Sequence, residues 1–148
     1  MSLYENLPNY QLLHNYHLLE VERIYNDRYR YKLLRRFEYH LGILKFAEYS
    51  GRFLEYKKGW LILKPGYCWD GASGPTINTK SLILPSLIHD ACYQLIRERY
   101  FSKLLRRKVD EKFKKLYLEE AKGILKPLFW LRAHWLYLGT RIGGFFYV

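Results

Sequence analysis

The sequence has few cysteines, and this scarcity limits the kinds of fold that it can encode. Cys68 and Cys92 are the two cysteines among 148 residues, too few for a disulfide-stapled domain and usual for a chain in a reducing compartment. Neither belongs to a CxxC pair, and no second pair of ligands follows. A common zinc site is therefore not expected. We interpret both cysteines as small core residues.

Long apolar runs are also lacking. The most apolar segment, 125–138, is interrupted by Lys126, Arg132 and His134, and it is too short to span a bilayer. Residues 1–10 contain an acid and a proline but no apolar run of the kind found in secretion signals. We find no repeat, linker or low-complexity segment. We therefore expect one soluble domain, 1–148, in which residues 1–13 form a loosely attached N-terminal segment.

Acidic residues are scarce relative to basic ones. There are 25 Lys and Arg residues against 14 Asp and Glu, which gives a formal net charge of +11. Such an excess attracts polyanions such as nucleic acid, anionic lipid or an acidic protein, although it can also serve solubility. The span 97–126 holds eleven of the basic residues and five acids. We expect a solvated helix face here or a polyanion contact surface, the latter carried by Arg106, Arg107, Lys108, Lys112 and Lys115.

Alternating apolar and polar residues in the first half predict β-strands. The alternation covers 29–34 and 37–43, as in strands with one buried face, whereas 18–24 fits a strand or a short helix. Lys57-Lys58-Gly59 has the composition of a hairpin loop and leads into an apolar strand over 60–63. These patterns predict an antiparallel sheet of about four strands.

Helical spacing replaces this alternation in the second half. A helix is expected over 84–96, with Pro85 in its first turn, where a missing N–H costs nothing. An amphipathic helix is expected over 107–122 because apolar residues recur at helical spacing. These are Val109, Phe113, Leu116, Tyr117 and Ala121.

A third helix is expected to begin at Pro127 and to end at Gly143-Gly144. One of its sides is apolar and comprises Leu128, Leu131, Trp135, Leu138 and Ile142. Another carries polar tips, which we interpret as a packing face, and comprises Trp130, His134, Tyr137 and Arg141. Strands followed by helices predict an α+β fold, in which three C-terminal helices pack on the sheet.

The polar groups that could carry chemistry gather in one stretch, residues 67–93, which reads YCWDGASGPTINTKSLILPSLIHDACY. Asp70 and Ser73 lie in a glycine-rich turn, and His89-Asp90 lies on the first expected helix. His89 and Tyr93 share a face of that helix because they are four residues apart. Asp110, near the start of the next helix, returns past His89 if the connection is short. We therefore expect Asp70, His89, Asp90 and Asp110 to meet near one point.

Two interpretations of this cluster remain open, one functional and one structural. A histidine beside carboxylates can act as a general base, or the carboxylates can hold a divalent cation such as calcium. The catalytic candidates are His89, Asp110, Asp70 and Ser73, and the cation candidates are Asp90 and Asp70. The alternative is structural, since Asp-Gly is an ordinary turn signal and a histidine on an apolar face is often a hydrogen-bonded core residue. The same residues, with Gly71, Pro75 and Tyr93, would then form a buried latch between turn and helix.

Four motifs in order resemble the phage- and prophage-associated domain of unknown function 1353 family. They are KPGYCWDGASGP at 64–75, LIHDACYQ at 87–94, RRKVDEKF at 106–113 and LRAHWLYLGTRIGG at 131–144. The resemblance implies a virus-derived protein in the host cytoplasm or on the virion, with a phage or host protein as partner. It implies no activity, and it singles out Asp70, Gly71, Ser73, Pro75, His89, Asp90, Tyr93 and Asp110.

The segment HDACY is also similar to the active-site helix of secreted phospholipases A2. That similarity implies a water-activating His89, a calcium-binding Asp90, and a Tyr93 hydrogen-bonded to Asp110. The chain lacks the many disulfides of those enzymes, and WDGASGP stands in place of their calcium loop. We therefore treat the similarity as a chemical analogy. Three functions follow as hypotheses: a hydrolase-like protein, a non-catalytic assembly or host-factor-binding protein, and a nucleic-acid binder acting through 97–126.

Overall fold

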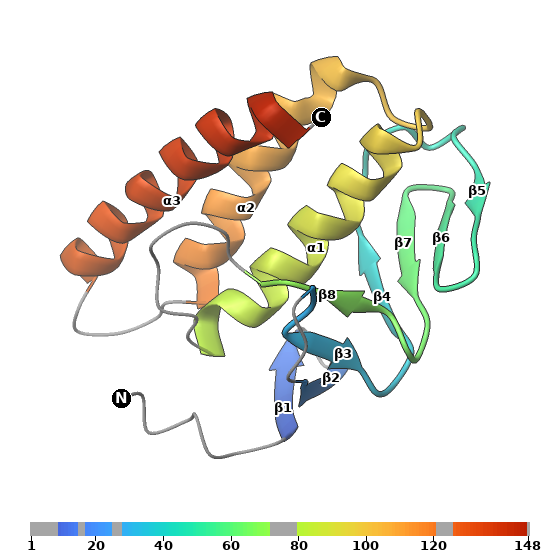
Figure 1. Ribbon diagram of the computed structural model, residues 1–148, viewed down its shortest axis with the longest axis horizontal. Helices are drawn as coiled ribbons and strands as arrows, with labels where there is room; N and C mark the ends of the chain where they lie inside the picture. Colours follow the sequence, from blue (N-terminus) through green and yellow to red (C-terminus); the bar gives the residue numbers. More distant parts are fainter. Residues whose placement is uncertain (1–8, 15–16, 25–27, 72–79, 121–125, 148) are drawn as a thin grey trace. The chain divides into compact units, whose positions relative to one another are not determined.

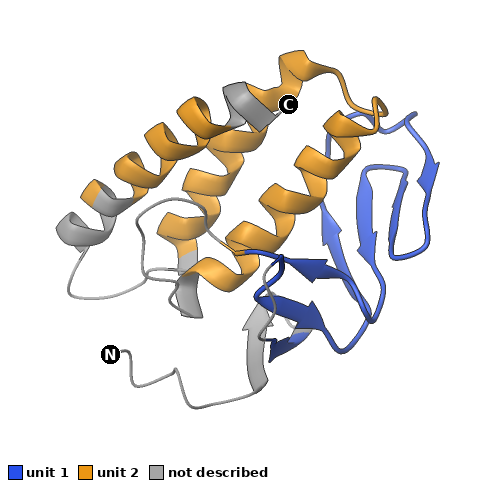
Figure 2. Ribbon diagram, in the orientation of Figure 1, with its two compact units in different colours: residues 1–70 blue, residues 71–148 orange. Residues whose placement is uncertain are grey.

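The computed structural model describes residues 9–14, 17–24, 28–71, 80–120 and 126–147 (Figure 1). The chain divides into two compact units, 1–70 and 71–148 (Figure 2). In the described residues, every strand precedes every helix, which confirms the predicted α+β class. The expectation of one domain stays a prediction, and each unit is described on its own below.

The first unit contains two antiparallel sheets. One has the strand order β1-β2-β3-β8, formed by β1 (Asn9–His14), β2 (His17–Arg23), β3 (Tyr31–Leu33) and β8 (Cys68–Trp69). In it Val21 pairs with Leu33, and Tyr31 pairs with Trp69. All four of these side chains are buried, and the intervening residues are more exposed, as the two-residue period of a strand requires.

The other sheet has the order β4-β7-β6-β5. Its strands are β4 (Phe37–His40), β5 (Tyr49–Ser50), β6 (Leu54–Lys57) and β7 (Trp60–Leu63). The predicted hairpin is present: Lys58 and Gly59 join β6 to β7, with φ of 51° and 82°. Positive φ at both central residues is the backbone of a type I′ turn, one of the two common two-residue hairpin turns. Leu54, Tyr56, Leu61 and Leu63 are the buried side chains of this hairpin.

Two expectations for the first half need correction. The predicted single sheet is two sheets: β3 pairs with β2 and β8, whereas β4 pairs with β7 in the other sheet. Residues 9–13, expected to belong to a loosely attached segment, form most of β1 and pair with β2 along its length. The hydrogen bonds of this pairing hold residues 9–13 to β2. A local sequence pattern does not show which strand a segment pairs with.

The second unit contains three helices that lie side by side (Figure 1). Helix α1 (Lys80–Arg97) is buried on almost every side from Leu82 to Ile96. It begins earlier than predicted, so the expectation that Pro85 lies in the first turn is wrong: Pro85 lies inside the helix. Proline removes one helical hydrogen bond there. Burial of the surrounding apolar residues offsets this loss.

Helix α1 ends in a tight reversal that sends α2 back beside it. Arg99 has a φ of 65°, and the amides of Tyr100 and Phe101 both donate to the Leu95 carbonyl at 2.9 and 3.0 Å. A short 3₁₀ helix, η1 (Lys103–Leu105), follows and is capped by the Ser102 hydroxyl. The connection is therefore short, as the predicted return of Asp110 past His89 required.

Helix α2 (Arg106–Glu120) contacts both α1 and α3 (Lys126–Tyr147). Its predicted apolar residues Val109, Phe113, Leu116 and Tyr117 are buried. Ala121 and Gly123 lie outside the described residues. A cluster of buried side chains joins the three helices and comprises Leu82, Phe113, Tyr117, Ala133 and Leu136.

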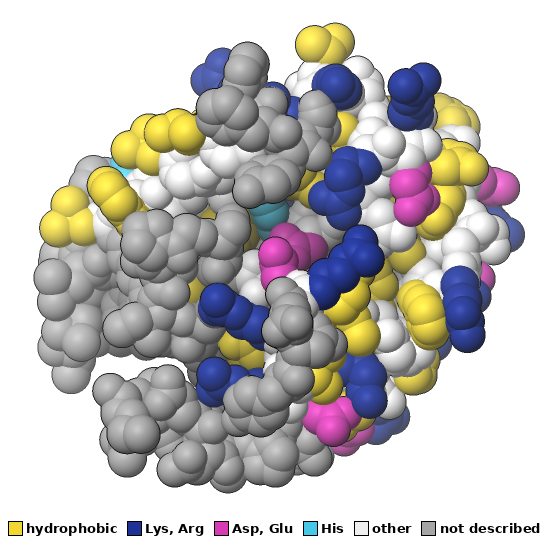
Figure 3. All heavy atoms as spheres, in the orientation of Figure 1, with side chains coloured by type: hydrophobic (Ala, Val, Ile, Leu, Met, Phe, Trp, Pro, Cys, Tyr) yellow, Lys and Arg dark blue, Asp and Glu magenta, His cyan; other side chains and the backbone are white. Residues whose placement is uncertain are grey.

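Helix α3 departs from the prediction in its end and in its buried face. It continues through Gly143 and Gly144 to Tyr147, since two glycines lower helix propensity by amounts that tertiary packing can override. The predicted apolar side is exposed: Leu131, Trp135, Leu138 and Ile142 are 53–64% accessible, whereas Leu128 lies among residues whose side chains are not described. Figure 3 shows hydrophobic side chains gathered along the edge of the molecule that α3 occupies.

The buried face of α3 carries smaller residues, namely Ala133, Leu136 and Thr140. The Thr140 hydroxyl donates to the Tyr137 carbonyl at 2.8 Å, which satisfies it inside the helix. His134, Tyr137 and Arg141 are half-buried beside this face, as their predicted role as packing residues with polar tips implies. None of the described helices has the length and apolar character needed to cross a bilayer.

Candidate functional site

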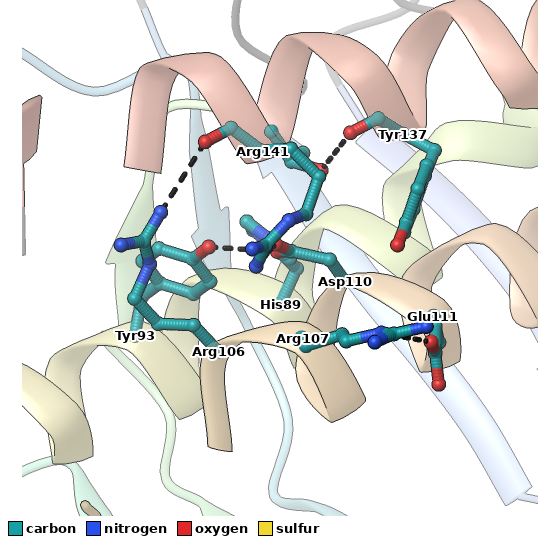
Figure 4. Close-up of polar contacts among 9 residues, drawn as sticks. His89, Tyr93, Arg106, Arg107, Asp110, Glu111, Tyr137 and Arg141 are labelled. Atoms are coloured by element: carbon teal, nitrogen blue, oxygen red, sulfur yellow. Dashed lines mark hydrogen bonds and ion pairs between the residues drawn. The ribbon is translucent and has the colours of Figure 1, made fainter. Parts of the chain in front are cut away.

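The candidate site is built on the buried carboxylate of Asp110. This residue lies near the start of α2 and is 0% exposed. Its Oδ1 accepts hydrogen bonds from His89 Nε2 at 2.9 Å and from the Tyr93 hydroxyl at 2.7 Å. Its Oδ2 accepts from Arg141 Nη1 at 3.3 Å (Figure 4). One carboxylate thus binds donors from α1 and α3, and a buried charge requires partners of this kind.

The helices position these donors through simple spacing. His89 and Tyr93 are one turn apart on α1, so their side chains lie on the same face. That face meets α2 at Asp110, because the reversal after α1 places the two helices side by side. Arg141 reaches Asp110 from α3. The helical spacing and the short connection thus bring His89 to Asp110, as expected.

Aromatic rings hold the His89 imidazole on two sides. Its centroid lies 4.3 Å from that of Tyr93 and 5.0 Å from that of Phe113. The side chain retains 11% of its exposure. The ring is therefore fixed in orientation but has not lost all contact with solvent.

The two nitrogens of His89 face different carboxylates. Nε2 donates to the buried Asp110, which favours the neutral tautomer with its lone pair on Nδ1. Nδ1 lies 3.6 Å from Asp90 Oδ1, and the Asp90 side chain is 24% exposed. Burial disfavours the charged ring, but the hydrogen bond to Asp110 and the attraction of the Asp90 and Asp110 carboxylates outweigh that effect. Together they raise the pKa of His89 above its ordinary value of 6.5.

Tyr93 acts as a donor in this cluster. Burial and the bond to the Asp110 carboxylate raise the pKa of its hydroxyl. The hydroxyl therefore keeps its proton at neutral pH and continues to stabilise Asp110.

Two arginines complete the cluster, and the sequence had assigned them elsewhere. Arg141 was placed only on a packing face, and Arg106 was counted in the basic surface. Arg106 Nη2 donates to the Arg141 carbonyl at 3.3 Å, and its Nε is buried with no hydrogen-bond partner among the described residues. Arg106 is half-buried at the contact of α2 with α3 (Figure 4). The sequence signal for these two arginines is Asp110, an acid beside the apolar residues of α2 that needs a cation as partner when it is buried.

The remaining residues of the predicted basic surface differ in their environment. Arg107 is exposed and forms a 3.0 Å ion pair with Glu111, and Lys115 lies 4.0 Å from Glu119. Lys108 is exposed, and Lys112 is half-buried. Part of the positive charge is therefore balanced within α2. Binding of a polyanion by this face stays a prediction.

The other predicted residues belong to the segment that follows β8 in the sequence. Asp70 is exposed at the end of β8, and Gly71 follows with a φ of 81°. The expectation of a buried Asp70 in a latch is therefore wrong, because the chain leaves the two-residue strand at this point. Ser73 and Pro75 lie outside the described residues. The catalytic and cation-binding roles of Asp70 stay predictions.

The structure also describes the environment of the two cysteines and of the residues that could bind a metal ion. Burial raises the pKa of Cys92 to about 12, so its thiol stays protonated, as suits a core residue; Cys68 is half-buried. Within the described part of the chain, no three His, Cys, Asp or Glu side chains form a group that could hold a metal ion. Cation binding by Asp90 stays a prediction.

Comparisons of the chain with protein-family models, with curated proteins and with solved structures found no match. The resemblance to the domain of unknown function 1353 family therefore rests on the four sequence motifs. The phospholipase analogy implied a hydrogen bond between Tyr93 and Asp110, and this bond is present.

Proposed function

We propose that this chain is a hydrolase in which His89 is the general base. The observation that carries the proposal is the 2.9 Å bond between His89 Nε2 and a fully buried Asp110. This bond fixes the ring and directs its basic lone pair to Nδ1. A buried acid that orients a histidine is the arrangement used by enzymes that activate water or a hydroxyl group.

The proposed reaction is a proton transfer followed by attack. Nδ1 of His89 accepts a proton from water while the water oxygen attacks a carbonyl or phosphoryl centre of the substrate. The imidazolium then lies between the carboxylates of Asp110 and Asp90, which stabilise its charge. It returns the proton to the leaving group, so His89 ends the cycle neutral.

The test compares wild-type protein with His89→Ala and Asp110→Asn on chromogenic carboxylic and phosphate esters, with and without added calcium. We expect His89→Ala to lower kcat/KM by about 100-fold or more. His40→Gln is a matched control, because His40 is exposed in the first unit and packs against the Trp60 ring at a tilt of 54°. Unchanged hydrolysis by His89→Ala would show that His89 is not the base.

The pH dependence of kcat/KM gives a second readout. The rate is expected to rise with pH as His89 loses its proton, with a midpoint above 6.5 because the pKa is raised. Asp90→Asn removes one cause of that shift, so the midpoint is expected to move down. A midpoint that stays in place would exclude His89 as the titrating group.

A second candidate function is non-catalytic: an assembly or host-factor-binding protein in which the cluster is a structural latch. The favouring observation is that Asp110 is 0% exposed and binds donors from both neighbouring helices. This candidate predicts that Asp110→Ala destabilises the fold and that His89→Ala changes no hydrolytic rate.

We also propose a phage or prophage origin, which the four sequence motifs support.

A further inference from the structure

The end of the second sheet presents an exposed apolar tip in a segment that also carries three lysines. Strands β4 and β5 are the two outer strands of this sheet, so the loop 41–48 that joins them crosses the end where the β6–β7 turn lies. The amides of Leu41 and Gly42 donate to the Gly59 carbonyl at 2.9 and 3.2 Å, which fastens the loop to the turn. We call residues 41–47 and 57–60 the sheet-end surface.

The apolar side chains of this surface point into solvent. Phe46 is fully exposed at 102%, and Leu44 is 42% exposed. Trp60, at the start of β7, is 38% exposed. Large exposed apolar groups on neighbouring segments commonly mark a docking surface.

The fold holds the tip in place. The Ala47 amide donates to the Leu44 carbonyl at 2.9 Å and closes a turn below Phe46. The Tyr56 hydroxyl donates to the Ile43 carbonyl, which ties the loop to β6. Phe46 is therefore presented by a hydrogen-bonded loop, and little conformational freedom is lost when it binds.

Three lysines belong to the sheet-end surface. Lys45 lies within the loop, Lys57 ends β6, and Lys58 lies in the adjacent turn; all three are exposed. The loop and the turn are close, since a Cβ added at Gly59 would lie 3.6 Å from Lys45 Cγ. The whole chain carries a net charge of +11, so its long-range field also favours an anionic partner.

We propose that the sheet-end surface docks on an anionic membrane, with Leu44 and Phe46 inserted between lipid headgroups and the three lysines on their phosphates. A leucine and a phenyl ring gain most from an apolar medium, and neither offers a hydrogen bond to a base edge. The tip also protrudes, whereas single-stranded nucleic acid follows grooves. A protruding apolar tip with cations beside it fits a bilayer interface, where tryptophan is also favoured.

The test is co-sedimentation of the full-length chain with vesicles made of phosphatidylglycerol and phosphatidylcholine in equal parts, and with vesicles of phosphatidylcholine alone. We expect binding to the anionic vesicles that weakens as salt is raised. Phe46→Ser is expected to lower the partition coefficient by roughly tenfold. Lys57→Glu/Lys58→Glu is expected to remove the preference for the anionic vesicles.

Leu104→Ser is the matched control, since Leu104 is 89% exposed in the second unit, and its partition is expected to equal that of the wild type. Circular dichroism of each variant verifies that it is folded. Equal binding by Phe46→Ser and wild type would overturn the proposal, as would no binding of the wild type at low salt. Binding to single-stranded DNA that needs Phe46, without vesicle binding, would instead assign the surface to nucleic acid. His89→Ala is expected to bind vesicles normally, so this test is independent of the proposed hydrolysis.

Discussion

Replacement of Asp110 by alanine tests the physical basis of the candidate site. The change removes a fully buried acceptor of three hydrogen bonds and leaves Tyr93, His89 and Arg141 without their partner. Hydrogen bonds to a charged group are worth about 1.5–3 kcal/mol each. The His89 and Arg141 side chains keep 11% and 37% of their exposure, so water can replace part of what they lose. Loss of one member of a buried charge pair costs about 3–5 kcal/mol, and we expect the free energy of unfolding to fall by that amount.

Denaturant unfolding followed by far-ultraviolet circular dichroism measures this loss. The adjacent Glu111→Ala variant is the control, since Glu111 is exposed and forms a surface ion pair with Arg107. Surface pairs contribute about 0–1 kcal/mol, so this control is expected to stay close to wild type. If Asp110→Ala were as stable as Glu111→Ala, Asp110 would not be the buried centre of the helices.

Two further predictions concern the second unit. The pKa of His89 is raised above 6.5 in the folded protein, so the stabilising contribution of His89 is complete below pH 6.5 and is lost as pH rises through the folded pKa. The free energy of unfolding should decline over that pH range. A decline of the same size in His89→Gln would contradict this prediction. Leu136→Ala is expected to cost about 2–5 kcal/mol because Leu136 is buried, whereas Trp135→Ser, at 59% exposure, is expected to change stability by about 0.5 kcal/mol or less. Equal melting temperatures of these two variants would show that the buried face of α3 has been misidentified.

Local patterns in the sequence predicted the elements that depend on neighbouring residues. The 57–60 hairpin followed from its turn composition, and the buried stripe of α2 followed from the spacing of Val109, Phe113 and Leu116. The contact of His89 with Asp110 was also accessible, because helical spacing and a short connection were enough to place it. The bond of Tyr93 to Asp110 came only from the phospholipase similarity.

Features that depend on distant parts of the chain were not predicted. The pairing of β8 with β3 joins residues far apart in sequence and adds a strand to the first sheet. On α3 the large apolar residues suggested the wrong face, because the residues that are buried are Ala133, Leu136 and Thr140. Arg141 became a partner of Asp110 only when that packing brought it there.

The three donors on Asp110 have a consequence for how the second unit opens. Burial of a carboxylate away from water is strongly unfavourable unless hydrogen-bond donors or cations contact it. The partners of Asp110 come from α1 and from α3. Detachment of α3 alone would remove Arg141 and leave Asp110 short of its cation. The free energy needed to detach α3 therefore includes the cost of leaving the Asp110 carboxylate, which stays buried between α1 and α2, without Arg141. The three helices are expected to exchange their amide hydrogens in one cooperative event, so that a single charge couples their unfolding.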